Sequence, residues 1–132
     1  MLELIDAPTF STLLKYELRS ARRFRRFATI VAMGTTNGIP PSLPKLLDET
    51  LRDSDVVAQD ENELTVLMPE TDPNGVLCAL KRYILQTSTL GLRYGVATFP
   101  TDAREDHKLM STALRRLNLA REQDGVVMVV DG

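Results

Sequence analysis

The sequence predicts an α/β (α+β) fold in which a mostly antiparallel central sheet is flanked by helices, and three observations carry this prediction. The chain has 132 residues, of which 43% are hydrophobic and 26% charged, as expected for one soluble globular domain. Helical and strand patterns alternate along it without an internal repeat. Two apolar runs, 56–58 and 64–68, flank a tight polar turn, and strands joined in this way must be antiparallel.

The first half of the chain predicts a helix, a strand, a second helix and the hairpin. Asp6, followed closely by a proline, is typical of a helix start. The β-branched run 28–33 predicts a buried strand, 34–41 a loop, and the leucines of 43–51 a short helix. The first helix should pack through apolar residues at steps of three and four, namely Phe10, Leu13, Leu14, Leu18, Ala21 and Phe24.

The second half predicts two helices and two strands. A Pro-Glu-Thr-Asp-Pro segment ends the hairpin and begins a helix that runs to about Leu85. A strand at 90–98, a long helix at 106–122 and a closing strand at 126–130 follow. An antiparallel hairpin in this order excludes a Rossmann-type sheet and favours a ferredoxin-like arrangement with the helices on one face of the sheet.

Charge and cysteine content narrow the functional classes. The net charge of -2 gives no overall attraction to nucleic acid or membrane, so we expect neither as a partner and expect any anion site to be local. Cys78 is the one cysteine, which predicts a reducing, cytoplasmic setting and a buried small apolar side chain. The first residues lack the basic region of a signal peptide, and no apolar run reaches membrane-spanning length.

A run of basic residues is the most conspicuous charge feature. It favours a solvated helix face or a protein-docking surface over nucleic-acid binding, because Phe24 and Phe27 are expected to point into the core rather than to stack on bases. The run comprises Lys15, Arg19, Arg22, Arg23, Arg25 and Arg26.

Five segments resemble, in order and spacing, the GGDEF family of diguanylate cyclases. They are residues 18–23, 52–58, 64–72, 94–100 and 117–125, and together they extend over nearly the whole chain. The resemblance implies a nucleotide-cyclase palm-type sheet and one degenerate GGDEF-like domain across residues 1–132.

The expectation that the domain is degenerate depends on the hairpin. Asp60-Glu61-Asn62-Glu63-Leu64 stands where the family has its signature, so that two glycines and an acidic metal ligand are replaced and only Glu63 keeps its acidic character. The first strand also ends without the family's acid pair, and Arg121 replaces its closing lysine. Because joining two GTP molecules requires metal ions held by carboxylates, we expect no enzyme, no metal site and no cofactor.

Arg52-x-x-Asp55 is the best candidate for a surviving site, since it resembles the family's inhibitory R-x-x-D site for cyclic di-GMP. A guanidinium fork can hold guanine O6 and N7 or a phosphate, while a carboxylate accepts from guanine N1–H and N2–H. Lys81 and Arg82 are expected to help from the next helix. Four residues separate Asp55 from the signature, one fewer than in the family. If the missing residue is lost from the strand, every later residue of that strand points to the opposite face of the sheet. If it is lost from the turn, Arg52 and Asp55 are undisturbed.

Two function hypotheses follow, with a third ranked far below them. The first is a non-catalytic signalling module that binds cyclic di-GMP, with ligand-linked homodimerisation or a protein partner. The alternative is a pure protein–protein interaction scaffold in which the segment 52–55 is only a polar turn between a helix and a strand. The third is residual diguanylate cyclase activity.

Overall fold

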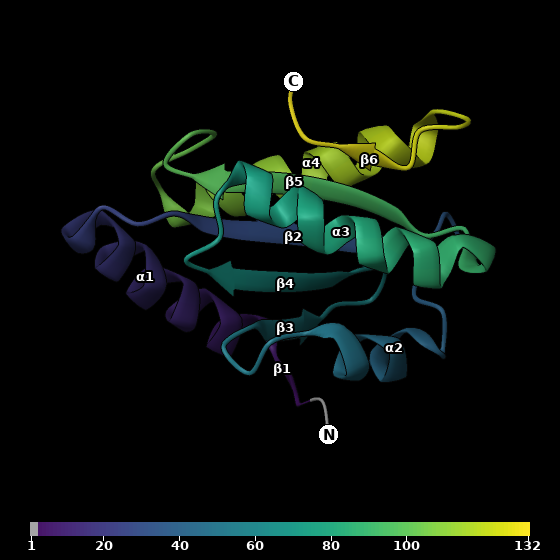
Figure 1. Ribbon diagram of the computed structural model, residues 1–132, viewed down its shortest axis with the longest axis horizontal. Coiled ribbons are helices and arrows are strands. Elements are labelled where there is room, and N and C mark those ends of the chain that lie inside the picture. The colour runs from purple at the N-terminus through teal and green to yellow at the C-terminus, as the bar shows by residue number, and fades with distance from the viewer. Residues whose placement is uncertain (1–2) are drawn as a thin grey trace.

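The computed structural model describes residues 3–132 and contains, over that part of the chain, one six-stranded sheet and four α-helices (Figure 1). In chain order the elements are β1 Leu4–Ile5, α1 Ala7–Phe24, β2 Ala28–Gly34, α2 Leu43–Thr50, β3 Val56–Gln59, β4 Leu64–Pro69, α3 Pro73–Thr87, the 3-10 helix η1 Ser88–Leu90, β5 Arg93–Phe99, α4 Asp106–Glu122 and β6 Met128–Val129.

The sheet is antiparallel at its centre and parallel at its two edges. Its strand order is β1-β3-β4-β2-β5-β6, with antiparallel pairing between β3 and β4, β4 and β2, and β2 and β5. The short strands β1 and β6 pair in parallel with β3 and β5. The predicted fold class is therefore confirmed, and so is the predicted element order, to which the structure adds β1.

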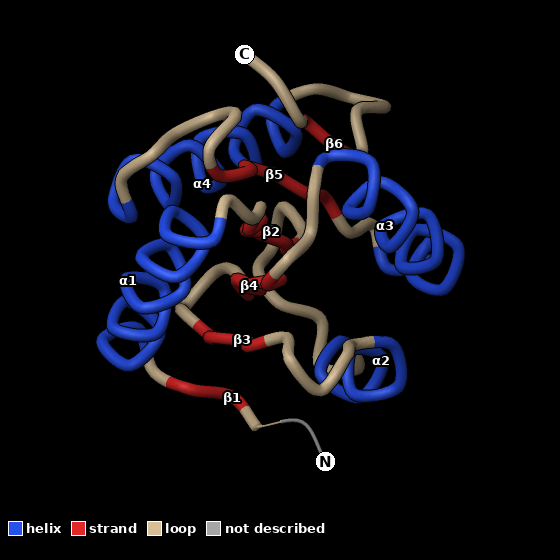
Figure 2. The backbone as a smooth tube through the Cα atoms, turned by 60° about the vertical axis from the view of Figure 1, so that its left-hand side comes forward, coloured by secondary structure: helices blue, strands red, loops and turns tan. Residues whose placement is uncertain are grey.

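Helices cover both faces of the sheet, which corrects the prediction that they lie on one face. Figure 2 shows α1 and α4 on one side of the strands and α2 and α3 on the other. Every residue of β2 is buried, because each face of this strand packs against a helical layer. The nearly continuous apolar run at 28–33 is typical of a strand covered on both faces, so the sequence did indicate a second helical layer.

The two layers meet the sheet through separate cores. Ile30 and Ala97 face α1 and α4, whereas Val31 and Val96 face α2 and α3. Helix α4 approaches β5 so closely that a Cβ atom on Gly95 would collide with the backbone of Ala113 and Leu117. Only glycine fits there, and the close approach sets the position of α4.

Helix α1 begins as predicted, with the Asp6 carboxylate accepting the Thr9 N–H at 2.8 Å. Its buried stripe differs, however, because Phe10, Leu14, Leu18 and Ala21 are buried while Leu13 and Phe24 are exposed. The buried residues follow one another at steps of four, four and three, and a further step of four from Ala21 leads to position 25, so Phe24 lies beside the buried stripe. The prediction that Phe24 and Phe27 point into the core was wrong. Within residues 3–132 no helix combines the length and apolarity needed to cross a bilayer.

Three further local predictions are corrected. Strand β5 begins at Arg93 rather than at residue 90, because η1 and Gly91, with φ of 69°, turn the chain first. Strand β6 is limited to Met128–Val129. Cys78 is exposed, since the buried residues of α3 recur from Val76 at steps of four and three and leave position 78 on the opposite side.

Candidate functional site

The turn between α2 and β3 brings Arg52 and Asp55 together. The Asp55 N–H donates to the Arg52 carbonyl at 3.0 Å, which closes the turn. One carboxylate oxygen of Asp55 accepts the Arg52 backbone N–H at 3.0 Å, and the other accepts Arg52 Nη2 at 3.1 Å. The two residues therefore form a local unit in which backbone and side chains support each other.

The Arg52 side chain also reaches the end of β4. Its Nη2 donates to the Pro69 carbonyl at 3.0 Å and to Thr71 Oγ1 at 2.8 Å. All three side-chain contacts use this one nitrogen, and no described residue is a hydrogen-bond partner of Nη1 or Nε. The Arg52 side chain is 52% exposed, whereas that of Asp55 is 3% exposed. The guanidinium is thus anchored at one corner and keeps donors directed to solvent.

Two clefts share this pair. A cleft of about 580 Å³ lies against α3 and is lined by Arg52, Asp55, Glu70, Thr71, Arg82 and Tyr83, among others. A second cleft of about 370 Å³ lies toward β1 and includes Arg52, Asp53 and Asp55. Of the two cations expected to help, Arg82 lines the larger cleft and Lys81 lines neither. The difference follows from helical spacing, because Gly75, Cys78 and Arg82 lie on the face of α3 that borders the cleft.

Tyr83 is a lining residue that the sequence analysis missed. Burial raises the pKa of its hydroxyl, and the Asp55 charge raises it further, while a hydrogen bond with Thr50 and the Arg82 and Arg52 charges act in the opposite direction. The buried Tyr83 side chain thus forms part of the cleft wall beside Asp55. Its one-turn spacing from Leu80 and Thr87 shows only that it belongs to the buried stripe, so spacing alone could not have revealed this role.

The predicted hairpin forms between β3 and β4, with Leu64 buried in the core. The Asp60 N–H donates to the Glu63 carbonyl at 3.0 Å to close the turn. Burial raises the pKa of Glu63, and the Asp60 charge adds to this effect while Arg121 opposes it. Within residues 3–132, no three histidine, cysteine, aspartate or glutamate side chains converge to hold a metal ion.

Arg121 is already engaged in holding this turn. Its Nη2 donates to the Asn62 carbonyl, which fastens the hairpin to α4. The contact passes directly over Gly34, where a Cβ atom would lie 2.7 Å from the Asn62 oxygen and would also meet the Arg121 guanidinium. The end of β2 can therefore approach the hairpin turn closely because Gly34 has no side chain, and Arg121 holds the turn in this position.

No protein-family model and no curated protein sequence matches the chain. Solved structures do match. The GGDEF domain of YfiN (TpbB) from Pseudomonas aeruginosa has a TM-score of 0.80 at 18% identity, over 100% of this chain and 99% of that one. The FimX GGDEF domain from the same organism has a TM-score of 0.82 at 17% identity, over 97% and 94%. The active GGEEF domain of a diguanylate cyclase from Vibrio cholerae has a TM-score of 0.79 at 11% identity, over 96% of each chain. The chain thus has the fold of a GGDEF domain.

These neighbours overturn the prediction that the chain is not an enzyme. The fold it adopts is that of diguanylate cyclase domains, and one of the matching structures is an active cyclase domain. The altered hairpin at Asp60–Glu63 therefore does not establish that the chain lacks activity.

Proposed function

We propose that this chain with the GGDEF fold is a signalling module that binds cyclic di-GMP at Arg52 and Asp55. The observation that carries the proposal is the position of the Arg52 guanidinium, which is half exposed, anchored by Nη2 alone, and shared by two clefts. Such a group offers spare donors at a place where a ligand has room to approach.

The chemistry of the pair matches a guanine nucleotide. Nη1 and Nε of Arg52 can donate together to guanine O6 and N7 or to two phosphate oxygens. The Asp55 carboxylate accepts two hydrogen bonds from Arg52 and retains lone pairs for guanine N1–H and N2–H. Because Asp55 is 3% exposed, this second contact requires the Arg52 side chain to swing away from it. Ligand binding would thus replace the Arg52–Asp55 ion pair by hydrogen bonds from guanine to Asp55 and from Arg52 to the ligand.

The two clefts support a ligand with two guanine rings. Arg52 and Asp55 border both clefts, so a dinucleotide can approach the pair from the β1 side or from the α3 side. On the α3 side, the Arg82 guanidinium supplies a second cation for a phosphate, and the Tyr83 ring lines the wall. A ligand that occupies both sides of the pair would also present a surface to a second copy of the chain, which supports ligand-linked homodimerisation.

Calorimetric titration of cyclic di-GMP tests the proposal. Wild-type protein should bind, and Arg52→Ala should lose tenfold or more in affinity, since a charge-assisted hydrogen bond contributes about 1.5–3 kcal/mol. Arg115→Ala is the matched control, because Arg115 is exposed on α4 and its side chain donates a hydrogen bond to the Gly132 carbonyl, away from the cleft. Absence of heat with wild-type protein at high micromolar ligand would contradict the proposal and favour the interaction-scaffold alternative.

A further inference from the structure

One end of the sheet carries a dense group of arginines that the proposed function does not use. Strand β2 begins at Ala28 opposite Phe99, the last residue of β5, so the end of α1 and the loop after β5 lie side by side (Figure 1). Arg22 Nη2 donates to the Arg104 carbonyl at 2.6 Å across this junction. We call this end the basic pole and define it by Arg22, Arg23, Phe24, Arg25, Arg26, Phe27 and Arg104.

Most of the positive charge at the basic pole is uncompensated. Arg26 pairs with Glu70, but Arg22, Arg23, Arg25 and Arg104 have no carboxylate at ion-pair distance among residues 3–132. A cation in the last turn of a helix is stabilised by the helix dipole, which accounts for Arg22 and Arg23. It does not account for Arg25 and Arg104, which lie beyond the helical residues.

Arg25 also occupies a strained backbone position. It is the C-cap of α1, with φ of 54° and ψ of 48° in the left-handed region that glycine adopts most readily. Its N–H donates to the Ala21 carbonyl, a bond that the backbone of any non-proline residue could make. Capping therefore does not require an arginine, and a side chain here costs stability.

Two aromatic rings are exposed among these charges. Phe24 is 61% exposed, and Phe27, which is 39% exposed, lines a recess of about 210 Å³ together with Arg22, Arg25, Arg26, Pro100 and Arg104. Exposing large apolar side chains to water is unfavourable unless a partner covers them. Aromatic rings beside cations are favoured at a bilayer's headgroup boundary, where rings enter the apolar region and cations face anionic lipids.

We propose that the basic pole docks on the surface of a bilayer containing anionic phospholipids. The guanidinium groups of Arg23 and Arg26 lie over the Phe24 ring, 5.5 and 5.1 Å from its centre. A nucleobase, which stacks on a ring face, would have to displace them, whereas a bilayer boundary accepts the ring by its edge. The bilayer is therefore the occupant that this geometry favours over single-stranded nucleic acid.

The distribution of charge along the strands fits this orientation. The acidic turn with Asp60, Glu61 and Glu63 adjoins Leu64, which pairs with Met33 near the opposite end of β2. When the basic pole faces an anionic surface, this turn is directed away from it. The repulsion that the net charge of -2 would otherwise cause is thereby reduced by distance and by screening.

Co-sedimentation with lipid vesicles tests the proposal. The protein should bind vesicles made of equal parts phosphatidylcholine and phosphatidylglycerol, should release them as salt rises, and should not bind phosphatidylcholine alone. Arg23→Ser with Arg25→Ser should weaken binding about 30-fold, on the basis of about 1 kcal/mol per cation near an anionic surface. Lys45→Ser with Arg115→Ser removes two exposed cations elsewhere and should bind far more tightly than the first pair.

A second variant separates this function from a structural role. Arg25→Gly relieves the left-handed backbone, so its thermal unfolding temperature should match or exceed that of the wild type while vesicle binding falls about fivefold. Phe24→Ser should weaken binding about tenfold through lost apolar contact. Undiminished binding of Arg25→Gly and Phe24→Ser would overturn the proposal. So would displacement from the mixed vesicles by a single-stranded DNA oligonucleotide at equal phosphate concentration.

Discussion

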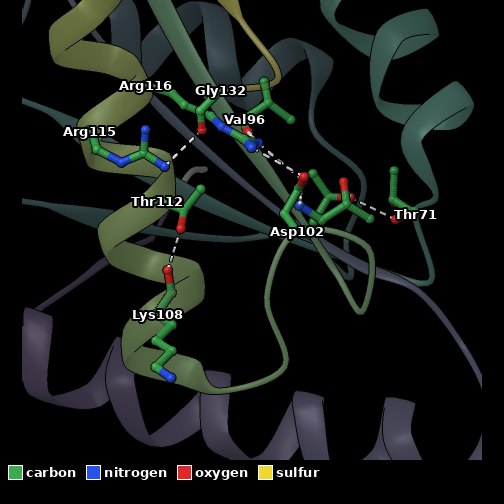
Figure 3. A network of polar contacts seen from close by, with 10 residues as sticks. Thr71, Val96, Asp102, Lys108, Thr112, Arg115, Arg116 and Gly132 are labelled. Atoms are coloured by element: carbon green, nitrogen blue, oxygen red, sulfur yellow. Dashed lines mark hydrogen bonds and ion pairs between the residues drawn. The ribbon is translucent and has the colours of Figure 1, made fainter.

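Two arginine–aspartate pairs, one between α4 and the loop after β5 and one in the turn between α2 and β3, differ in how much of the guanidinium they use. Arg116 on α4 donates through Nη2 to Asp102 Oδ1 at 3.2 Å and through Nη1 to the Val96 carbonyl at 2.7 Å, and Nη1 also forms an ion pair with Asp102 Oδ2 at 3.1 Å (Figure 3). Its side chain is 6% exposed. Arg52, by contrast, contacts Asp55 and β4 through a single nitrogen and is 52% exposed.

The contrast distinguishes an arginine that supports the fold from one with capacity for a ligand. Arg116 fastens α4 to the loop after β5, where the Asp102 carboxylate also accepts the Thr98 N–H at 2.8 Å. Removing it would leave a partly buried carboxylate without its cation. Removing Arg52 would likewise leave Asp55 with its backbone N–H donor, but the guanidinium that is lost is half exposed rather than buried. The predictions below follow from this contrast, in order of decreasing effect on stability.

The largest effect is expected for Arg116→Ala. Loss of one partner of a buried pair typically costs about 3–5 kcal/mol, and the partial exposure of Asp102 places the expected loss of unfolding free energy near the lower value. Urea denaturation measures it. The double variant Arg116→Ala with Asp102→Ala should be less destabilised than the sum of the single variants. Strict additivity would show that the two side chains do not interact.

Alkaline pH should destabilise the protein without discharging either pair, because arginine stays protonated and aspartate ionised. Burial raises the pKa of Tyr94 to about 12, although its hydrogen bond with Thr87 opposes this, whereas the unfolded residue titrates near 10. The contribution of the protonated Tyr94 hydroxyl to the free energy of unfolding is fully present below pH 10. It decreases by roughly 2–3 kcal/mol as the pH rises to 12. Urea denaturation over this range should show a smaller loss for Tyr94→Phe. An equal loss would assign the effect to other groups.

An intermediate effect is expected for Thr29→Val, which lies between the two pairs. The Thr29 hydroxyl contacts the Thr71 carbonyl at 2.7 Å and Thr98 Oγ1 at 2.9 Å. Its loss should reduce unfolding free energy by about 1–2 kcal/mol, since buried polar groups lose a partner. Affinity for cyclic di-GMP should change less than twofold by calorimetry. A larger change would show that the two pairs are coupled across the sheet.

The smallest stability effect is expected for Arg52→Ala. The pair joins a half-exposed guanidinium to a buried carboxylate that keeps its backbone N–H donor, so the expected loss of unfolding free energy in urea denaturation is about 1 kcal/mol, below that of Arg116→Ala, while ligand affinity falls sharply. Arg52→Lys should retain the ion pair but lose the planar fork, and its affinity should lie between those of the wild type and the alanine variant. A destabilisation of Arg52→Ala as large as that of Arg116→Ala would remove the distinction between the two pairs.

The strongest sequence patterns predicted the fold well. The hairpin was readable because two apolar runs flank a turn too short to allow any other pairing. Strand β1 was not readable, since Leu4–Ile5 is too short for a periodic pattern and is held only by its parallel partner β3. The second helical layer was implied by the unbroken apolar run of β2 but was misread as a one-sided sheet.

The candidate site was readable in part. The juxtaposition of Arg52 and Asp55 could be expected from their spacing in a turn, and Arg82 from its helix. The contacts of Arg52 with Pro69 and Thr71 join residues far apart in the chain, so no local pattern reveals them. Phe24 is the last residue of α1, and no composition or hydrophobic pattern indicates the left-handed backbone of the next residue, Arg25, that ends the helix there.

The most direct test of the central claim is a heteronuclear NMR titration of labelled protein with cyclic di-GMP. If Arg52 and Asp55 hold the ligand, the Arg52 Nε–H resonance and the amides of Asp55, Thr71 and Arg82 will shift together and saturate with one binding curve. Resonances of the Arg116–Asp102 pair should stay in place. Shifts confined to the hairpin turn at Asp60–Glu63, or no shifts at high micromolar ligand, would contradict the account.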